Sequence, residues 1–355
     1  VLVMNASGQP GDGAKIRIRG TGSITAGAGP LYVVDGVAGG SFNPNDVETL
    51  TVLKDASATA LYGAAAAGGV IVVTTKSAKS DTPTITLKAT AGIKKALTGR
   101  FAPMNSQELY DLQSKIYSKT LFKLQRPETL LEQDFNWVDE AFNLGVVQDY
   151  YASAAGKAGR VNWFASISHY DEEGSLINTN HKKSSARLNL TAPIGNKVNL
   201  AVRLNYDRGK TQYTSSYVTL EAAYRASPWD NPYDVNTGEI LFVNDTKRSD
   251  NGKPWYSHDS YNILHNEQYN YNIGESEDIT ADLQLNWNIT DWLMFTSTNR
   301  FSSSNWFNES YIDPRTNLPG GSGTISNSYG QGWGFGTTNL LKANKTFGNH
   351  SVNGI

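Results

Sequence analysis

From Thr84 onward the sequence alternates apolar and polar residues with a period of two, and this pattern restricts the fold more than any other feature. Between Val198 and Tyr206 every even-numbered residue is apolar or aromatic, whereas the odd-numbered ones are Asn199, Ala201, Arg203 and Asn205. Residues 279–289 repeat the pattern. Such strands have one apolar and one polar face. Soluble β-sandwiches and membrane β-barrels both contain them, so the alternation leaves these two folds open.

The lengths of the connections between the predicted strands favour the barrel. Tight turns are expected at 156–160, 193–197, 288–292 and 347–350. Longer segments lie between them, at 97–146, 174–181, 213–275 and 308–335. Successive connections of an up-and-down meander lie on opposite rims, so one rim carries short turns and the other carries loops. Outer-membrane barrels have this asymmetry, and we therefore expect a membrane β-barrel.

Aromatic residues gather near the ends of the predicted strands, where the girdles of a membrane barrel lie. These residues are Tyr150, Tyr151, Tyr170, Tyr206, Trp287, Trp292 and Trp306. Aromatic residues are enriched in strands of every kind, so this feature by itself is equally compatible with a soluble sheet.

Composition and motifs argue against several other classes of protein. The net charge of -2 provides no excess of positive charge for a phosphate backbone, so we expect no nucleic acid partner. Cysteine is absent, which excludes a disulfide framework and a thiolate zinc site. The apolar run at 60–73 is shorter than the roughly 20 residues that span a bilayer as a helix. The first residues do not resemble a secretory signal, so we expect the chain to begin downstream of any targeting segment.

Residues 1–78 have a different pattern, which predicts a small α/β domain. Strands are expected at 16–19, 31–36, 47–53 and 70–73. Asp55 stands where a helix N-cap belongs, before a helix-compatible segment at 56–62 that Gly63 would end. The order strand, helix, strand at 47–73 predicts a parallel pair of strands with a crossover helix.

Several sequence blocks follow one another in this domain: IRIRG at 16–20, PLYVVDG at 30–36, NPNDVE at 43–48, VLKDASA at 52–58 with LYG at 61–63, and GVIVVTTK at 69–76. Together they resemble the plug of a SusC/RagA-type TonB-dependent outer-membrane transporter. The strand-rich remainder resembles the front part of that family's barrel in style. The plug motif covers Arg17, Arg19, Gly20, Asp35, Gly36, Lys54, Asp55, Gly63 and Gly69.

The resemblance implies a plug domain at 1–78, seated in the lumen of an antiparallel barrel of about 22 strands. Residues 83–355 would then form the N-terminal part of this barrel, with long extracellular loops. The resemblance also implies import of oligosaccharides or oligopeptides powered by TonB, with a SusD-like surface lipoprotein as a lid. The implied location is the outer membrane of a Gram-negative bacterium of the Bacteroidetes type.

Charged residues of the plug are candidates for the coupling of this energy to transport. Arg17 and Arg19 would share one strand face, and Asp35, Glu48 and Asp55 are available acids. In one interpretation these residues dock the plug on the barrel wall, so that pulling on the N-terminus breaks the contacts. The alternative is that they form ordinary buried pairs or caps within the plug.

Candidate substrate contacts lie in the longest loop, where aromatic and polar residues are mixed. The aromatic members are Trp229, Tyr233, Trp255 and Tyr256, and this mixture suits stacking on sugars or contact with a peptide backbone. The alternative is that they pack the loop against itself.

No sequence pattern supports catalysis. The P-loop, dinucleotide, nucleophile-elbow and HExxH motifs are absent. His258 and His265, with Asp259, fit no standard metal-ligand spacing, so we expect neither a metal nor a cofactor. A second interpretation is a soluble or surface-anchored β-rich carbohydrate-binding protein. It explains the strands and the aromatic loops, but neither the alternating connection lengths nor the plug-like blocks.

Overall fold

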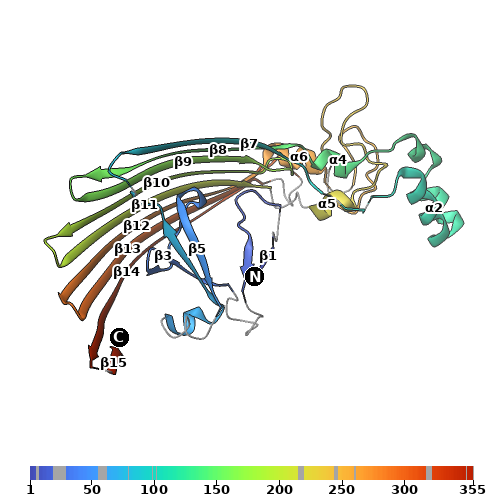
Figure 1. The fold of residues 1–355 in the computed structure, drawn as a ribbon. Helices are drawn as coiled ribbons and strands as arrows, with labels where there is room; N and C mark the ends of the chain where they lie inside the picture. The colour runs from blue at the N-terminus through green and yellow to red at the C-terminus, as the bar shows by residue number, and fades with distance from the viewer. Residues whose placement is uncertain are drawn as a thin grey trace.

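The computed structural model of the chain describes residues 1–4, 8–18, 29–54, 62–78, 80–97, 99–100, 102–214, 220–243, 247–259, 261–316, 322–348 and 350–354. It contains two units (Figure 1). The N-terminal unit comprises strands β1 to β6, and a large curved sheet, called the wall below, comprises β7 to β15. Figure 1 shows the wall arching over the N-terminal unit.

The wall is one nine-stranded sheet in which each strand pairs antiparallel with its neighbour in the sequence. Its strands are β7 (Thr84–Lys94), β8 (Gly145–Ala158), β9 (Val161–Glu173), β10 (Asn180–Ile194), β11 (Val198–Tyr213), β12 (Tyr271–Thr290), β13 (Leu293–Ile312), β14 (Thr324–Phe347) and β15 (His350–Gly354). Tight turns and longer connections alternate along this order. The predicted meander, with one short rim and one rim of loops, is confirmed. The longer connection predicted at 308–335 is wrong in its bounds, because β13 continues to Ile312 and β14 begins at Thr324.

The wall is apolar on its convex face and polar on its concave face. Leu87, Ile167 and Ile279 lie in one convex row of the register and are 78%, 64% and 42% exposed. On the concave face, Arg187 and Asp207 are each 6% exposed and face the N-terminal unit. A water-soluble sheet would bury its apolar face instead. This distribution matches a barrel with lipid outside and a polar lumen inside.

The N-terminal unit consists of two small sheets. In the first, β1 (Leu2–Met4) pairs antiparallel with β2 (Lys15–Arg17). The second has the order β4 (Val37–Ala38), β3 (Leu31–Val34), β6 (Val70–Thr75) and β5 (Val47–Leu53), with the 3-10 helices η1 (Pro44–Asp46) and η2 (Gly63–Ala66) beside it. Val33 and Val70 are buried on one face of this sheet, and Ile71 and Val73 on the other, as expected for a strand covered on both sides.

The predicted parallel pairing of 47–53 with 70–73 is wrong. β5 and β6 are antiparallel, with Leu53 opposite Val70. The end of β5 therefore lies beside the start of β6. The parallel neighbour of β6 is β3, in which Leu31 opposes Val70. An apolar central strand needs two neighbours, and the local pattern does not say on which side each earlier strand lies. The segment 55–61, where the N-cap and most of the crossover helix were expected, lies outside the described residues.

The two longest connections of the wall fold together at one of its ends (Figure 1). They contain α2 (Ser106–Ile116), α3 (Lys119–Gln125), η3 (Glu128–Glu132), α4 (Trp137–Ala141), α5 (Leu220–Arg225) and α6 (Ile263–Tyr269). We call this region the loop unit. Its core includes Trp137, Ala223, Trp255 and Ile263. None of the helices in the described ranges is long and apolar enough to cross a membrane.

The prediction that the strand-end aromatic residues form outward girdles is wrong for three of them. Tyr151, Tyr170 and Trp306 lie on the concave face, because they share it with residues that contact the N-terminal unit. Tyr150, Tyr206 and Trp287 lie on the convex face. Neighbours such as Tyr150 and Tyr151 cannot share a face, because successive side chains of a strand point to opposite sides.

Gly69, which precedes β6, provides a test of the N-terminal fold. Its φ is +96°, and a Cβ atom at this position would lie 3.0 to 3.1 Å from three atoms of the Ile18 side chain. We expect Gly69→Ala to destabilise the N-terminal unit by about 1–3 kcal/mol, because it adds both backbone strain and a close contact. Hydrogen-exchange mass spectrometry should then show faster amide exchange in β6. Gly92→Ala is the control, since a Cβ there meets open space, and equal exchange in both variants would contradict the expectation.

Candidate functional site

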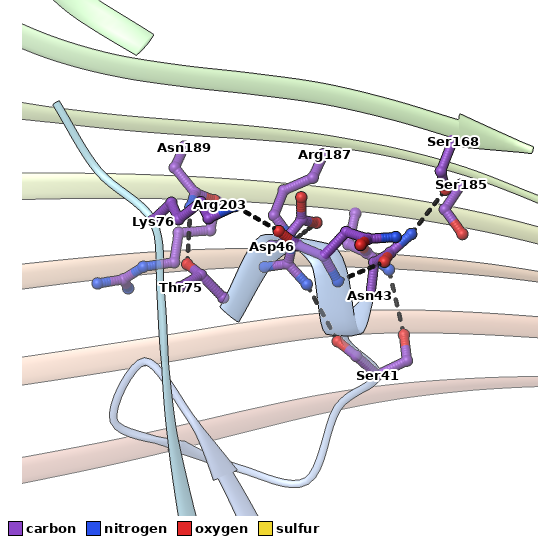
Figure 2. Close-up of polar contacts among 12 residues, drawn as sticks. Ser41, Asn43, Asp46, Thr75, Lys76, Ser168, Ser185, Arg187, Asn189 and Arg203 are labelled. Atoms are coloured by element: carbon purple, nitrogen blue, oxygen red, sulfur yellow. Dashed lines mark hydrogen bonds and ion pairs between the residues drawn. The ribbon is translucent and has the colours of Figure 1, made fainter. Parts of the chain in front are cut away.

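The N-terminal unit contacts the wall chiefly through residues 35–46, which follow β3. Asp35 and Gly36 have φ values of +50° and +85°, and the flanking Val34 and Val37 oppose each other. An Asp-Gly pair at this position favours a two-residue hairpin turn, because both residues tolerate positive φ. The turn reverses the chain and directs the following loop, with η1, at the wall (Figure 2).

Arg187 on β10 lies at the centre of this contact. Its Nε lies 3.2 Å from Asp46 Oδ2, its Nη1 lies 4.0 Å from Asp35 Oδ2, and its Nη2 donates to the Ser41 carbonyl at 3.1 Å. Nε makes no hydrogen bond, so its attraction to Asp46 is ionic, while the Tyr151 hydroxyl donates to the same carboxylate at 3.0 Å. The side chains of Arg187 and Asp46 are 5% and 2% exposed. One arginine of the wall therefore neutralises two buried acids of the N-terminal unit.

Asp35 connects this cluster to the end of β6. Its carboxylate accepts hydrogen bonds from the Thr75 amide at 2.8 Å and the Thr75 hydroxyl at 2.7 Å. Arg203 Nε lies 3.7 Å away on β11, and Asn189 on β10 donates to the Thr75 hydroxyl at 2.9 Å. The same carboxylate thus holds the fold of the N-terminal unit and its position on the wall.

Asp207 on β11 receives the next part of the loop. It accepts from the Ser41 hydroxyl at 2.7 Å and the Ser185 hydroxyl at 2.6 Å, and Lys183 Nζ lies 3.1 Å away. Asn205 donates to the Ser41 hydroxyl at 3.1 Å. These contacts are short and polar, and they involve side chains of two neighbouring wall strands.

Two asparagines extend the contact to the first strands of the wall. Asn43 donates to the Ser168 hydroxyl on β9 at 2.7 Å (Figure 2). Asn45 donates to Asp149 on β8 at 3.0 Å and accepts from Lys88 on β7 at 2.8 Å. The loop is therefore held by hydrogen bonds across the breadth of the curved sheet.

Arg300 on β13 holds the loop from the opposite side. Its guanidinium makes a two-point contact with Asp282, at 2.6 and 2.7 Å, and its Nη1 donates to the Ala38 carbonyl at 3.0 Å. Gly40 has a φ of +101°, and a Cβ atom there would lie 2.8 Å from Arg300 Nη1. The positive φ favours glycine at this position, and a larger residue would also displace the Arg300 guanidinium.

A second contact lies at the loop-bearing end of the wall, near the tip of the β1–β2 hairpin. The Gly11 amide donates to Glu172 at 3.2 Å, and Tyr170 and Lys94 bind the same carboxylate. A Cβ atom on Gly11 would lie 2.5 Å from His181 Nδ1, so the backbone packs directly on this side chain. The N-terminal unit is thus attached to the wall at two separate places.

Of the residues predicted to couple the plug to the barrel, Asp35 lies within the Arg187 cluster. Arg17 is exposed on β2, Glu48 is exposed on β5, and Lys54 is exposed immediately after β5. Three predicted residues lie outside the described part of the chain: Arg19, Gly20 and Asp55. The remaining predicted glycines, Gly36, Gly63 and Gly69, have positive φ values. Gly36 lies in the turn after β3, Gly63 begins η2 and Gly69 precedes β6.

Sequence reasoning did not identify the wall side of this contact. Arg187, Arg203 and Arg300 each stand at a polar position of an alternating strand, which indicated the lumen face but no partner. Asp46 lies in the NPNDVE block that carried the resemblance, yet nothing local marks it as the residue that meets Arg187.

The two tryptophans predicted to contact substrate are buried in the loop unit. Trp229 is 4% exposed, and its Nε1 donates to the Ser106 carbonyl at 3.1 Å. Trp255 is 5% exposed, and its ring packs on that of Trp137 at a centroid distance of 5.7 Å. These contacts favour the alternative that both residues pack the loop against itself.

The two predicted tyrosines are half-buried. The Tyr233 hydroxyl donates to Glu140 at 2.5 Å, and the Arg126 guanidinium lies 4.8 Å from the centre of the Tyr256 ring. Burial and the Glu140 hydrogen bond raise the pKa of Tyr233 to about 12. Both side chains are therefore partly exposed to solvent at the loop-bearing rim.

No metal-binding cluster of three or more His, Asp or Glu residues occurs in the part of the chain that the structure describes. His258 is exposed and lies 2.9 Å from Asp259. His265 is buried on α6 beside Phe242 and Tyr269. The two histidines thus lie in different surroundings.

Asp230 is a buried carboxylate of the loop unit, with 3% of its surface exposed. It accepts hydrogen bonds from the backbone amides of Tyr256 and Ser257 and from the Ser257 hydroxyl. Burial raises the pKa of Asp230 from 3.8 to about 6, although these donors oppose the shift. The segment 255–257 is therefore held by a group that titrates near neutral pH.

Replacement of Arg187 tests the contact that residues 35–46 and Thr75 make with the wall, which we call the seat of the N-terminal unit. We expect Arg187→Ala to weaken it by about 3–5 kcal/mol, because the buried Asp46 loses its counter-charge while Asp35 retains only Arg203. In the full-length protein in detergent, trypsin should then cleave the N-terminal unit at a lower urea concentration. Arg208→Ala removes an exposed ion pair with Glu275 and should change the seat by about 0–1 kcal/mol. The same urea dependence for both variants would show that Arg187 does not hold the unit.

The raised pKa of Asp230 predicts a pH dependence of the loop unit. The folded loop binds the proton more tightly than the unfolded loop, so the contribution to stability is complete below the ordinary pKa of 3.8 and is lost as the pH rises through about 6. Amide exchange at 255–257, corrected for its intrinsic pH dependence, should be slower near pH 5 than near pH 7. Asp230→Asn should abolish this difference, whereas the exposed Asp111→Asn should preserve it. A difference that persists in Asp230→Asn would assign it to another group.

Comparison with known proteins identifies both units. Residues 1–70 match the family model of the TonB-dependent Receptor Plug Domain. The TonB-dependent receptor SusC of Bacteroides thetaiotaomicron is 32% identical over 271 residues, which are 69% of this chain and 26% of that protein. The TonB-dependent receptor P26 of Formosa agariphila is 28% identical over 276 residues, which are 68% of this chain and 28% of that protein. The chain thus spans about a quarter of the length of these relatives.

Solved structures show the same fold. The structure of the RagAB peptide importer in the 'open-open' state has a TM-score of 0.80 at 25% identity, covering 98% of this chain and 42% of that one. A further structure of the RagAB peptide transporter gives a TM-score of 0.82 at 24% identity, with 98% and 43% covered. The N-terminal unit is therefore a plug and the wall is part of a barrel, and the chain belongs to the SusC/RagA-type TonB-dependent receptors of the bacterial outer membrane.

Proposed function

We propose that this chain supplies the plug and the first barrel strands of a TonB-dependent importer of nutrient oligomers, either oligosaccharides or oligopeptides. The observation that carries the proposal is the seat of the plug. A charged, hydrogen-bonded unit lies within a wall whose outer face is apolar, and Arg187 joins the two. The plug would comprise residues 1–78 and this part of the barrel residues 83–355.

The proposal includes two protein partners. TonB would supply energy from the inner membrane, and a SusD-like surface lipoprotein would act as a lid over the rim of loops. Similarity to SusC and to the RagAB peptide importer supports this assignment. The loop unit on one rim offers a folded surface on which such a lid could rest.

The plug contacts are suited to release under a pulling force. Hydrogen bonds such as Asn43 to Ser168 contribute about 0.5–1.5 kcal/mol each, because water replaces them when they break. They can therefore break one after another, whereas the Arg187 cluster resists more strongly because it is buried. Asp35 is a proposed coupling residue that contacts both Thr75 of the plug and two arginines of the wall. The other motif residues stay predictions for this role: Arg17, Arg19, Gly20, Gly36, Lys54, Asp55, Gly63 and Gly69.

This role requires no catalytic group, because the cargo crosses without a change in its covalent bonds. The polar lumen face supplies a hydrated surface along which sugars or peptides can exchange hydrogen bonds. For substrate contacts in the loop unit, Tyr233 and Tyr256 offer exposed surface, and Trp229 and Trp255 would support them from below. These four assignments stay predictions.

A disulfide tether tests whether import requires movement of the plug. These 355 residues contain no cysteine, so Asn43→Cys with Ser168→Cys introduces two thiols that have no competing partner among them. Their side chains are in contact across the plug and the wall. We expect oxidation to abolish TonB-dependent uptake of labelled oligosaccharides or peptides in cells, and reduction to restore it.

The matched control is Ser168→Cys with Ser185→Cys. These residues oppose each other on β9 and β10, so their disulfide links two wall strands and leaves the plug free. It should leave uptake unchanged. Normal uptake by the fully oxidised plug tether would exclude plug movement from the mechanism, and uptake without TonB would contradict the proposed function itself.

A further inference from the structure

Trp306 lies on the lumen face of β13, above the seat of the plug. It shares this face with Arg300, which contacts the plug at Ala38. The strand between them is regular, so Trp306 stands about 20 Å nearer to the loop-bearing rim, at about 3.3 Å per residue. This position is nearer to the loops than the contact of Arg300 with the plug, on the side from which a cargo molecule would arrive.

The indole of Trp306 is held against the backbone of the neighbouring strand. Gly330 on β14 is its direct partner, and a Cβ atom on Gly330 would lie 2.4 to 2.6 Å from Nε1, Cε2 and Cζ2 of the ring. The indole therefore occupies the space that any other residue at 330 would need. Trp306 is nevertheless 44% exposed, and the wall behind it directs this surface to the lumen.

Polar side chains surround the ring. Ser276 opposes Trp306 on β12, Asp278 lies diagonal to it, and Ser304 and Asn308 flank it on its own strand. Such neighbours in an antiparallel sheet lie within about 4.5–8 Å. Within the described residues, the side chains of Asp278, Ser304 and Asn308 form no hydrogen bond or ion pair, so their polar groups are available to a ligand.

We propose that Trp306 is a stacking platform for a pyranose ring of an incoming oligosaccharide, with Asp278, Ser304 and Asn308 binding the sugar hydroxyls. This inference rests on the proposed import function and selects the glycan among its two cargo classes. A pyranose has an apolar C–H face and a rim of hydroxyls, which match an aromatic surface framed by a carboxylate, a hydroxyl and an amide. A peptide backbone would need unpaired strand amides and carbonyls, but those of β13 are used by β12 and β14.

The wall below the platform leaves room for the rest of the chain of sugars. Gly332, Gly334 and Gly336 follow Gly330 on the lumen face of β14, and none has a positive φ that would require glycine. A Cβ atom on Gly332 or Gly336 would meet no other atom within 4 Å. Glycine within a strand lowers stability by about 0.5–1 kcal/mol relative to alanine. The glycines here therefore reduce the stability of β14 and leave open space beside it. Gly336 opposes Arg300, so the open path leads to the plug.

The test is equilibrium binding to the full-length receptor in detergent. The probes are linear oligosaccharides derived from starch, cellulose, xylan and mannan, together with uncharged peptides of similar length. We expect at least one oligosaccharide to bind, and Trp306→Ala to weaken that binding about tenfold or more. Trp306→Phe should restore part of the affinity. Trp333→Ala is the matched control, because Trp333 lies on the adjacent strand but on the lipid face.

A second pair of variants moves the ring without removing it. Gly330→Val should weaken oligosaccharide binding as Trp306→Ala does, because its side chain displaces the indole. Gly92→Ala adds a methyl group in open space on β7, outside the proposed sugar path, and should leave binding nearly unchanged. Heat-dependent mobility on gels shows whether Trp306→Ala folds. If it does not fold, the comparison of these two glycine variants tests whether Trp306 binds the sugar.

Three results would overturn the platform: no oligosaccharide binds, only peptides bind, or the affinity is the same in Trp306→Ala, Gly330→Val and the controls. Each of these can be separated from failure of the proposed function by measuring uptake in cells. Uptake that still depends on TonB, with unaltered sugar binding in both variants, would remove the platform and leave the importer in place. Uptake that does not depend on TonB would remove the importer whatever the binding result.

Discussion

A strand within a bilayer must pair every backbone amide and carbonyl with a neighbouring strand, because lipid offers no hydrogen-bond partner. The wall meets this requirement through sequential antiparallel pairing from β7 to β15. Side chains must then alternate between lipid and lumen, so the arginines at 187, 203 and 300 all face the plug. Both the seat of the plug and the position of Trp306 follow from this alternation.

The chemistry of the plug seat determines how it can be released. An apolar interface would lose about 25 cal/mol for each Å² exposed to water when the plug moved. The observed interface consists mainly of hydrogen bonds and ion pairs, which water can replace. The exception is Arg187 with Asp35 and Asp46, whose burial makes separation costly. The seat therefore combines one strong point with many weak ones, an arrangement suited to holding the plug at rest and freeing it under load.

Aromatic residues show how position changes the role of one residue type. Trp229 and Trp255 are core residues of the loop unit, Trp333 faces lipid, and Trp306 faces the lumen. All of them occur in sequence contexts rich in polar and aromatic residues. Their roles depend on which face of a strand they occupy and on what the surrounding loop covers. Tyr150 and Tyr151 are consecutive residues of β8, so their side chains point to opposite faces of the sheet. This part of the girdle prediction could therefore have been corrected from the sequence.

The sequence by itself determined the alternating strands, the two kinds of connection and the plug blocks, because each depends on residues close together in the chain. It also marked Asp35 as an acid of the plug, but it named no residue of the wall that Asp35 would contact. The tertiary structure decided that β5 and β6 run antiparallel and that Asp35 and Asp46 meet Arg187. It also decided that Trp306 rests on Gly330. These contacts join residues far apart in the chain, and their geometry is fixed by strand register and sheet curvature, which no local pattern records.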